Sequence, residues 1–281
     1  MTQGRSPVMQ RRRLAAELQR LRGISGKTLE EVAEHLECSP AKISRIENNL
    51  VAVRIQDARE LLDLYEVEDE RRESLLAMVR EARRKGWWSS FAGILDESTE
   101  NLLSLEEDAT RICVYDNSAV TPLIQTPDYT RAFLRSWTDL EADVLERRTE
   151  LFQQRQQILA RAEGAQLDIV LDEAALRRPV GDPEVMRRQL DRLIAESDRE
   201  LLELRVMPFA EGPYQAMGFP FQIFEFISDP RVVYTELFTG GRMIETAEEV
   251  GPYLSAFDQV WARALDPAQT RDFLKTLLGI G

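Results

Sequence analysis

One short stretch, from Thr28 to Asn48, constrains the fold of this chain more than any other. Thr28 followed three residues later by Glu31 is the pattern of a capping box at the N-terminus of a helix. Ser39 followed by Pro40 marks a second start, because Ser caps a helix and Pro lacks an N–H that the first turn leaves unbonded anyway. Apolar residues follow each start at helical spacing. The stretch therefore predicts two short helices joined by a tight turn.

The second of these helices has two distinct faces. Ile43 and Ile46 supply its inward face, and Ala33 on the first helix is small enough to let the two backbones cross closely. The outward face is small, polar or basic, and it fits the major groove, where Arg, Asn and Ser side chains read base edges. The alternative is a helical hairpin that never contacts DNA. We expect double-stranded DNA to be bound by Lys27, Thr28, Ser39, Pro40, Ala41, Lys42, Ser44, Arg45 and Asn48.

The segment CSPAKISRIE, Cys38 to Glu47, resembles the helix-turn-helix of the XRE family, the lambda repressor and Cro-like regulators. The resemblance implies a domain of five helices, of which residues 68–85 would form the fifth. We place the helix-turn-helix domain at residues 11–67 and interpret residues 68–86 as a linker helix between the domains. It also implies positive φ at the turn position, where the family usually has Gly and this chain has Glu37. A residue other than Gly costs about 1 kcal/mol there. Such regulators bind two-fold sites, so we expect a homodimer.

The charge of the chain is divided unevenly along its length. Residues 1–59 hold 11 Lys+Arg against 7 Asp+Glu, a net charge of +4, whereas residues 60–281 hold 25 against 42, a net charge of −17. The first segment is therefore suited to binding a polyanion. The acidity of the remainder either keeps the protein soluble or attracts a basic partner protein. No apolar run approaches the roughly 20 residues of a membrane span, and a signal-peptide core is missing. We expect a cytoplasmic protein that has no membrane segment.

The remainder mixes helical and strand patterns. A helix is expected from Leu103 to Tyr115. Strands are expected at Gln166–Leu171, Leu201–Met207, Phe221–Ile227 and Val232–Leu237, and a turn between the last two indicates a hairpin. The sequence therefore predicts an all-α helix-turn-helix bundle followed by an α+β domain, residues 87–281, with a small, largely antiparallel sheet.

Several longer motifs follow one another from Gly86 onward. They are GWW at 86–88, IQTPDYTRAF at 124–133, Arg155-Gln156, LDEAALRRPVGDPEVMRRQL at 171–190, VMPFAEGPYQAMGFPFQIFEF at 206–226 and VVYTE at 232–236. In these motifs the chain resembles the antitoxin-like C-terminal domain that follows an XRE helix-turn-helix in actinobacterial transcription regulators. The resemblance implies a transcription regulator whose C-terminal domain acts with a small companion protein or another effector.

Catalytic patterns are missing from the sequence. The only histidine, His35, falls on the expected solvent side of a helix in the DNA-binding domain, so a Ser/His/Asp or Cys/His arrangement is not expected in the second domain. Metal-ligand and phosphate-loop patterns are also missing, and we expect no enzyme, cofactor or metal site.

The C-terminal domain is expected either to sequester a partner protein or to sense a small molecule. The loop from Gly212 to Pro220 is longer and more aromatic than a passive connection requires. Candidate residues for a ligand or partner pocket are Trp87, Trp88, Tyr129, Tyr214, Phe219 and Phe221, and packing at the edge of the sheet is the alternative role for them.

Overall fold

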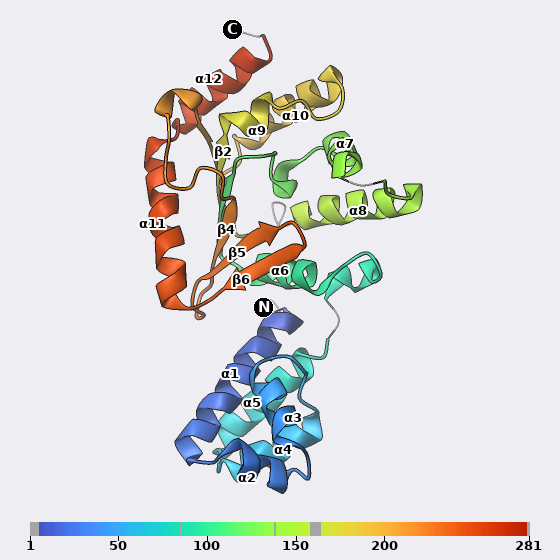
Figure 1. Cartoon of the computed structure of the whole chain (residues 1–281), viewed down its shortest axis with the longest axis vertical. Helices are drawn as coiled ribbons and strands as arrows, with labels where there is room; N and C mark the ends of the chain where they lie inside the picture. Colours follow the sequence, from blue (N-terminus) through green and yellow to red (C-terminus); the bar gives the residue numbers. More distant parts are fainter. Residues whose placement is uncertain (1–5, 85, 138, 158–163, 280–281) are drawn as a thin grey trace. The chain divides into compact units, whose positions relative to one another are not determined.

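The computed structural model describes residues 6–84, 86–137, 139–157 and 164–279 (Figure 1). Its chain divides into two compact units, Met1–Ser90 and Phe91–Gly281. The first unit is helical and the second contains a six-stranded sheet, which confirms the expected order of an all-α bundle and an α+β domain. None of the helices in the described parts of the chain is long and apolar enough to cross a membrane.

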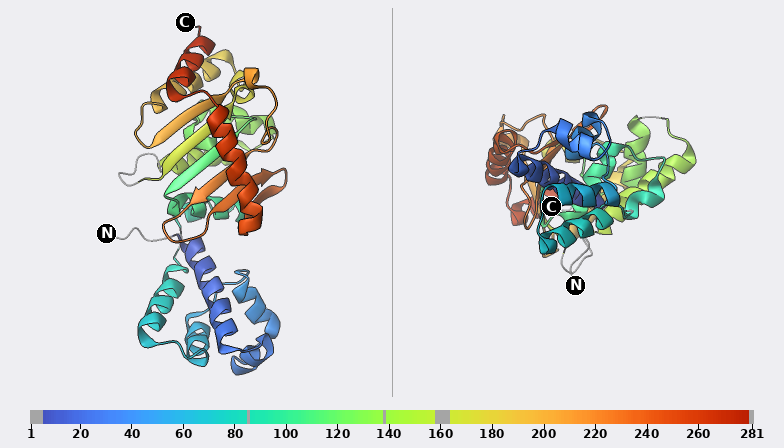
Figure 2. Two further views of the ribbon diagram at one scale, coloured as in Figure 1. Left: turned by 90° about the vertical axis from the view of Figure 1, so that its left-hand side faces the viewer. Right: turned by 90° about the horizontal axis from the view of Figure 1, so that it is seen from below.

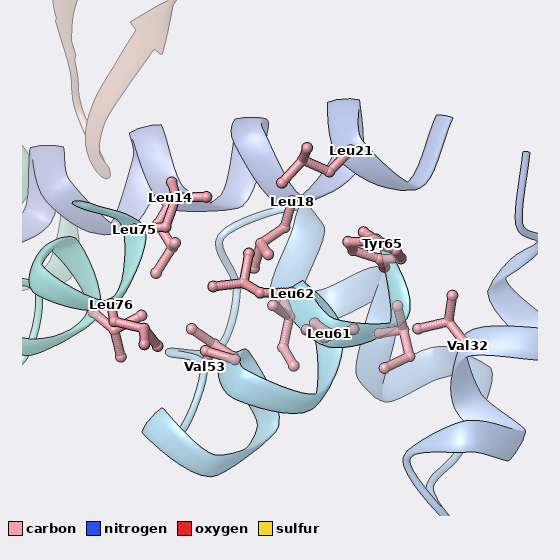
Figure 3. Close-up of a cluster of buried hydrophobic side chains, with 14 of the residues drawn as sticks. Leu14, Leu18, Leu21, Val32, Val53, Leu61, Leu62, Tyr65, Leu75 and Leu76 are labelled. Atoms are coloured by element: carbon pink, nitrogen blue, oxygen red, sulfur yellow. The ribbon is translucent and has the colours of Figure 1, made fainter. Parts of the chain in front are cut away.

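Five helices form the N-terminal unit around one apolar core. They are α1 (Pro7–Ser25), α2 (Leu29–His35), α3 (Pro40–Glu47), α4 (Ile55–Leu64) and α5 (Asp69–Glu81). Leu14, Leu18 and Leu21 recur along one face of α1 and pack against Leu61 and Leu62 of α4 in this core (Figure 3). The core thus joins helices that are far apart in the sequence.

The helix α5 lies within the stretch that was expected to link the two domains. Its residues Leu75, Leu76 and Val79 are buried in the same core as α1 and α4. The helix therefore packs as the fifth member of the bundle. Lys85, near the end of the expected linker, lies outside the described residues.

The local signals around the turn between α2 and α3 are confirmed. Thr28 and Glu31 form a complete capping box, and the hydroxyl of Ser39 accepts the N–H of Lys42 at 3.3 Å. Glu37 has a φ of 49°, the left-handed conformation expected at this turn. Ala33 is fully buried where the two helices meet.

The sheet of the C-terminal unit has the strand order β3-β2-β1-β4-β5-β6. Its strands are β1 (Arg111–Asp116), β2 (Gln166–Asp172), β3 (Leu202–Met207), β4 (Phe221–Glu225), β5 (Val232–Leu237) and β6 (Gly240–Ile244). The pairs β1–β2 and β2–β3 are parallel, and β1–β4, β4–β5 and β5–β6 are antiparallel. The sheet is mixed, so the prediction of a largely antiparallel sheet is wrong.

This error comes from the central strand, β1. Helix α6 (Glu97–Asp108) ends at Ala109, which has an extended backbone, and the chain continues as β1 through Ile112, Cys113, Val114 and Tyr115. A strand with neighbours on both sides and layers on both faces is apolar throughout, so it lacks the alternation that marks a half-exposed strand. The helix expected from Leu103 to Tyr115 included this apolar run, so the strand was not predicted. With β1 missing, the parallel pairing to β2 was missed as well.

Helices cover both faces of the sheet (Figure 1). The helix α11 (Ala247–Arg263) crosses one face, as the left view of Figure 2 shows. It buries Phe257 and Val260 against Tyr115, Phe221 and other side chains of that face. The helices on the opposite side and at the C-terminus are α6, α7 (Pro127–Trp137), α8 (Ala142–Arg155), α9 (Glu173–Arg177), α10 (Pro183–Glu196) and α12 (Pro267–Leu277). Single 3-10 turns lie at η1 (Trp87–Phe91), η2 (Pro122–Ile124) and η4 (Phe209–Glu211).

Candidate nucleic-acid interface

The helix α3 is anchored by its inward side chains and open on its outward face. Ile43 and Ile46 are almost fully buried in the core of the bundle. The outward face holds both fully exposed and partly covered residues. Ser39, Pro40, Ala41, Arg45 and Asn48 are exposed, and Lys42 and Ser44 are half-buried.

A buried ion pair joins α3 to α1. Arg22 donates from Nε to Oε1 of Glu47 at 2.7 Å and from Nη2 to Oε2 at 2.9 Å. Arg22 also donates from Nη1 to the carbonyl of Lys27 at 3.1 Å, so one guanidinium holds both α3 and the segment before α2. The hydrogen bonds that Arg22 donates to Glu47 raise the pKa of Arg22.

The sequence reasoning missed this pair, although a signal for it exists. Glu47 follows Ile43 by four positions and therefore lies on the inward stripe of α3. A carboxylate on such a stripe is stable only when it is paired, because an unpaired buried charge is costly. The sequence therefore indicates that Glu47 needs a basic partner, and the packing of the bundle shows that this partner is Arg22.

Two polar residues of the outward face are engaged within the bundle. The Nζ atom of Lys42 lies 2.6 Å from Oδ2 of Asp57 on α4. Asn48 donates from Nδ2 to the carbonyl of Ser44 at 2.8 Å and to its hydroxyl at 3.2 Å. Arg45 is exposed and forms no ion pair with any residue in the described parts of the chain. Its guanidinium is therefore the cation of α3 that is most readily available to an external anion.

The remaining expected contacts lie at the N-terminal ends of α2 and α3. The hydroxyl of Thr28 accepts the N–H of Glu31 at 3.2 Å, and Ser39 caps α3 in the same way. Lys27 precedes Thr28 and is half-buried. Helix N-termini carry partial positive charge, so both capped ends favour anionic groups.

The six residues suggested for a pocket do not gather around one cavity. Trp87 and Trp88 meet edge to face in the N-terminal unit, and a side chain on Gly86 would collide with the ring of Trp88. Tyr129 is buried, and its hydroxyl accepts the N–H of Val120 at 3.2 Å. Three further candidates, Tyr214, Phe219 and Phe221, belong to one loop and the strand that follows it.

Within this group, Tyr214 and Phe221 lie near each other and Phe219 does not join them. The rings of Tyr214 and Phe221 each contact Tyr115 of β1, at centroid distances of 6.0 and 5.8 Å. Phe219 points away and is 69% exposed. Tyr115 was not among the candidates, because the expected helix concealed the strand that carries it.

Comparisons with known proteins assign a domain to each unit. Residues 13–75 match a family model described as a helix-turn-helix domain, which covers most of α1, all of α2, α3 and α4, and part of α5. Residues 99–276 match the model of a domain of unknown function, DUF5753. No curated protein and no solved structure matches the chain. Because the second match covers more than half of its length, the chain belongs to the DUF5753 family.

Proposed function

We propose that this protein is a sequence-specific DNA-binding transcription regulator of the XRE type, with α3 as the helix that enters the major groove. The helix-turn-helix match over residues 13–75 supports DNA binding in general. The observation that carries the specific proposal is the geometry of α3. Its inward face and the Arg22–Glu47 pair fix the helix in the bundle, while Arg45 stands exposed and unpaired among the described residues.

In this proposal each residue has a defined task. Arg45 contacts a base edge or the adjacent phosphate, as Arg does most often in major-groove recognition. Lys42, Ser44 and Asn48 contribute polar contacts beside it. The protein acts in the cytoplasm as a homodimer on a two-fold operator, because each bundle presents a single recognition helix.

The C-terminal unit, in the same proposal, binds a partner protein or an effector and acts by binding rather than by catalysis. The resemblance to antitoxin-like regulators supports a protein partner. A second candidate function is therefore sequestration of a small protein, with DNA contact secondary. The two functions differ in whether loss of DNA binding abolishes regulation in the cell.

The test begins with genomic fragments that co-purify with the full-length protein, which identify an operator. The affinity of an Arg45→Ala variant is then measured on this operator and on a scrambled duplex. We expect a loss of about 1–3 kcal/mol on the operator and a smaller loss on the scrambled duplex if Arg45 reads a base. An equal loss on both would identify a phosphate contact.

The matched control is Arg80→Ala, which removes another exposed arginine from the same unit but from α5. It is expected to retain the affinity of the wild type. A protein that binds no duplex even at low ionic strength would overturn the proposal, because phosphate contacts are strongest under that condition.

A further inference from the structure

The loop between β3 and β4 exposes three large apolar side chains. Phe209 is 56% exposed, Met217 is 59% exposed and Phe219 is 69% exposed. We refer to these three residues as the apolar loop. Single exposed apolar residues are common, but several on one loop mark a surface that another molecule covers.

The first part of this loop is held by side chains from neighbouring elements. At its start, the N–H of Phe209 donates to Oε2 of the buried Glu173 at 2.8 Å. Further along, Arg263 of α11 donates from Nη2 to the carbonyl of Glu211 at 2.5 Å and from Nη1 to the carbonyl of Pro213 at 3.3 Å. These hydrogen bonds hold the backbone of Phe209 and of the residues that follow it in place.

The middle of the loop is fixed to the sheet through Tyr214. Its hydroxyl lies 2.7 Å from the hydroxyl of Tyr115 on β1 and donates to the carboxylate of Asp172 at the end of β2. Asp172 is itself held, because its Oδ1 accepts the N–H of Ala174 at 2.8 Å. Two residues after Tyr214, Ala216 is buried against the core under α11.

The loop is thus anchored to β1, β2, α9 and α11, although three of its apolar side chains face solvent. The backbone turns after Tyr214, where the N–H of Met217 donates to its carbonyl, and again where the N–H of Phe219 donates to the carbonyl of Ala216. Met217 and Phe219 are thus directed outward by an ordered backbone. A surface ordered before binding avoids the entropic cost of ordering it in the complex.

The charge of the unit decides which kind of molecule would cover the loop. Residues 91–281 hold 19 Lys+Arg against 34 Asp+Glu, a net charge of −15. Nucleic acid, an anionic membrane and the same unit of a second copy would all be repelled by this charge, whereas a cationic protein segment would be attracted.

The charges beside the loop agree with that assignment. The guanidinium of Arg263 is neutralised by Glu211, with Nε and Oε2 3.2 Å apart. Asp258 is exposed and forms no ion pair with the described residues. The next residue on α11, Gln259, contacts Gln215 of the loop at 3.4 Å, so Asp258 adds an uncompensated negative charge close to it.

We propose that the apolar loop is the docking surface for a cationic protein segment that carries apolar side chains. This inference rests on the proposed partner-binding role of the C-terminal unit and names its surface and the chemistry of its partner. Phe209, Met217 and Phe219 contact the apolar side chains of the segment, and Asp258 faces one of its Lys or Arg residues.

The experiment selects peptides of about 16 residues from a displayed random library on the immobilised full-length protein. The enriched peptides are synthesised, and their affinities are measured by fluorescence anisotropy. We expect them to carry net positive charge and large apolar residues, and to bind a Met217→Ser/Phe219→Ser variant at least tenfold more weakly. Asp258→Lys is expected to weaken binding several-fold, more at low salt than at high salt.

The control is Leu237→Ser/Phe238→Ser, which replaces two exposed apolar residues at the β5–β6 turn and is expected to leave peptide affinity unchanged. Circular dichroism and binding to the operator verify that each variant is folded, and a separate Phe209→Ser variant provides a second readout of the loop. Peptides that bind the loop variants as tightly as the wild type would overturn the docking surface alone. Enrichment of acidic peptides only, or of none, would overturn the partner-binding role as well.

Discussion

The Nζ atom of Lys42 on α3 lies 2.6 Å from Oδ2 of Asp57 on α4, so a carboxylate stands against the surface that we propose to face DNA. This contact orients Lys42 and also reduces the positive charge that the surface offers to phosphates. We predict that Asp57→Asn raises DNA affinity several-fold at low salt, because Lys42 is released and one repulsive charge is removed. The slope of log K against log salt steepens by about one when one more phosphate is neutralised.

The control for this prediction is Asp63→Asn on the same helix. It makes the same change in net charge, but Asp63 pairs with Arg72 of α5 instead of a residue of α3. An equal gain of affinity in both variants would mean that net charge alone, and not the release of Lys42, determines the effect.

Gln189 of α10 secures a buried loop in the C-terminal unit. Its Oε1 accepts the N–H of Thr126 at 2.7 Å, and its Nε2 donates to the carbonyl of Ile124 at 2.9 Å. Gln189 is fully buried, so no water replaces these bonds when the side chain is changed. We predict that Gln189→Leu lowers the free energy of unfolding by about 2–4 kcal/mol, since two backbone groups lose their partners.

Denaturant unfolding monitored by circular dichroism measures this effect. Gln215→Leu serves as the comparison, because Gln215 is exposed and, within the described residues, its side chain makes only the long contact to Gln259. It is expected to change stability by less than about 0.5 kcal/mol. Similar losses in both variants would show that the buried bonds of Gln189 contribute little.

The helix-turn-helix could be predicted from sequence because its signals are local. Thr28 with Glu31, and Ser39 with Pro40, define helix starts within four residues, and the structure has them where expected. The contacts that hold α3 in place are not local. Arg22 and Glu47 are 25 positions apart, and only the packing of the bundle brings them together.

In the C-terminal unit, whether a strand could be predicted depends on how its residues are buried. β5 (Val232–Leu237) and its hairpin partner β4 were found because a turn separates them and β5 becomes exposed toward its end. The central β1 is buried on both faces, and β6 begins with two glycines that weaken any strand signal. The role of Tyr214 depends on Asp172, 42 positions away, and no spacing pattern relates the two.

Gly241 in β6 makes room for the side chain of Tyr234 in β5. A Cβ atom at position 241 would lie 1.8 Å from the hydroxyl oxygen of Tyr234, which is buried and cannot move aside without disturbing the core. We therefore predict that Gly241→Ala destabilises the protein by about 1–3 kcal/mol.

The same replacement at Gly23 provides the control. Gly23 lies within α1 and is not followed by proline, and a Cβ atom there meets no described atom within 4 Å outside its own helix. Gly23→Ala is expected to stabilise the protein by about 0.5–1 kcal/mol, because Ala is the better helix former. Thermal unfolding of the two variants should therefore shift in opposite directions. A Gly241→Ala variant that is as stable as the wild type would contradict the close approach of Tyr234 to Gly241.

Asp116 at the end of β1 provides a prediction about pH. Its Oδ1 accepts the N–H groups of Ser118 and Ala119, yet burial raises the pKa of Asp116 from 3.8 to about 6. Between pH 4 and pH 6 the folded protein therefore retains a proton that the unfolded chain has lost. The contribution of Asp116 to stability falls as the pH rises through this window, and the full penalty is present above it.

We predict that Asp116→Asn is more stable than the wild type at pH 7 to 8 by about 1–2 kcal/mol and equally stable below pH 4. The amide oxygen of Asn can still accept both N–H groups, so the variant removes the charge and keeps the turn. Asp198→Asn should behave in the opposite way, because the hydrogen bond from Arg271 lowers the pKa of Asp198, and its contribution is present at neutral pH and lost in acid. Denaturant unfolding of both variants from pH 3.5 to pH 8 measures the two differences. If the stability difference between Asp116→Asn and the wild type did not change with pH, the pKa of Asp116 would have to be the same in the folded and unfolded protein, which would contradict the raised pKa.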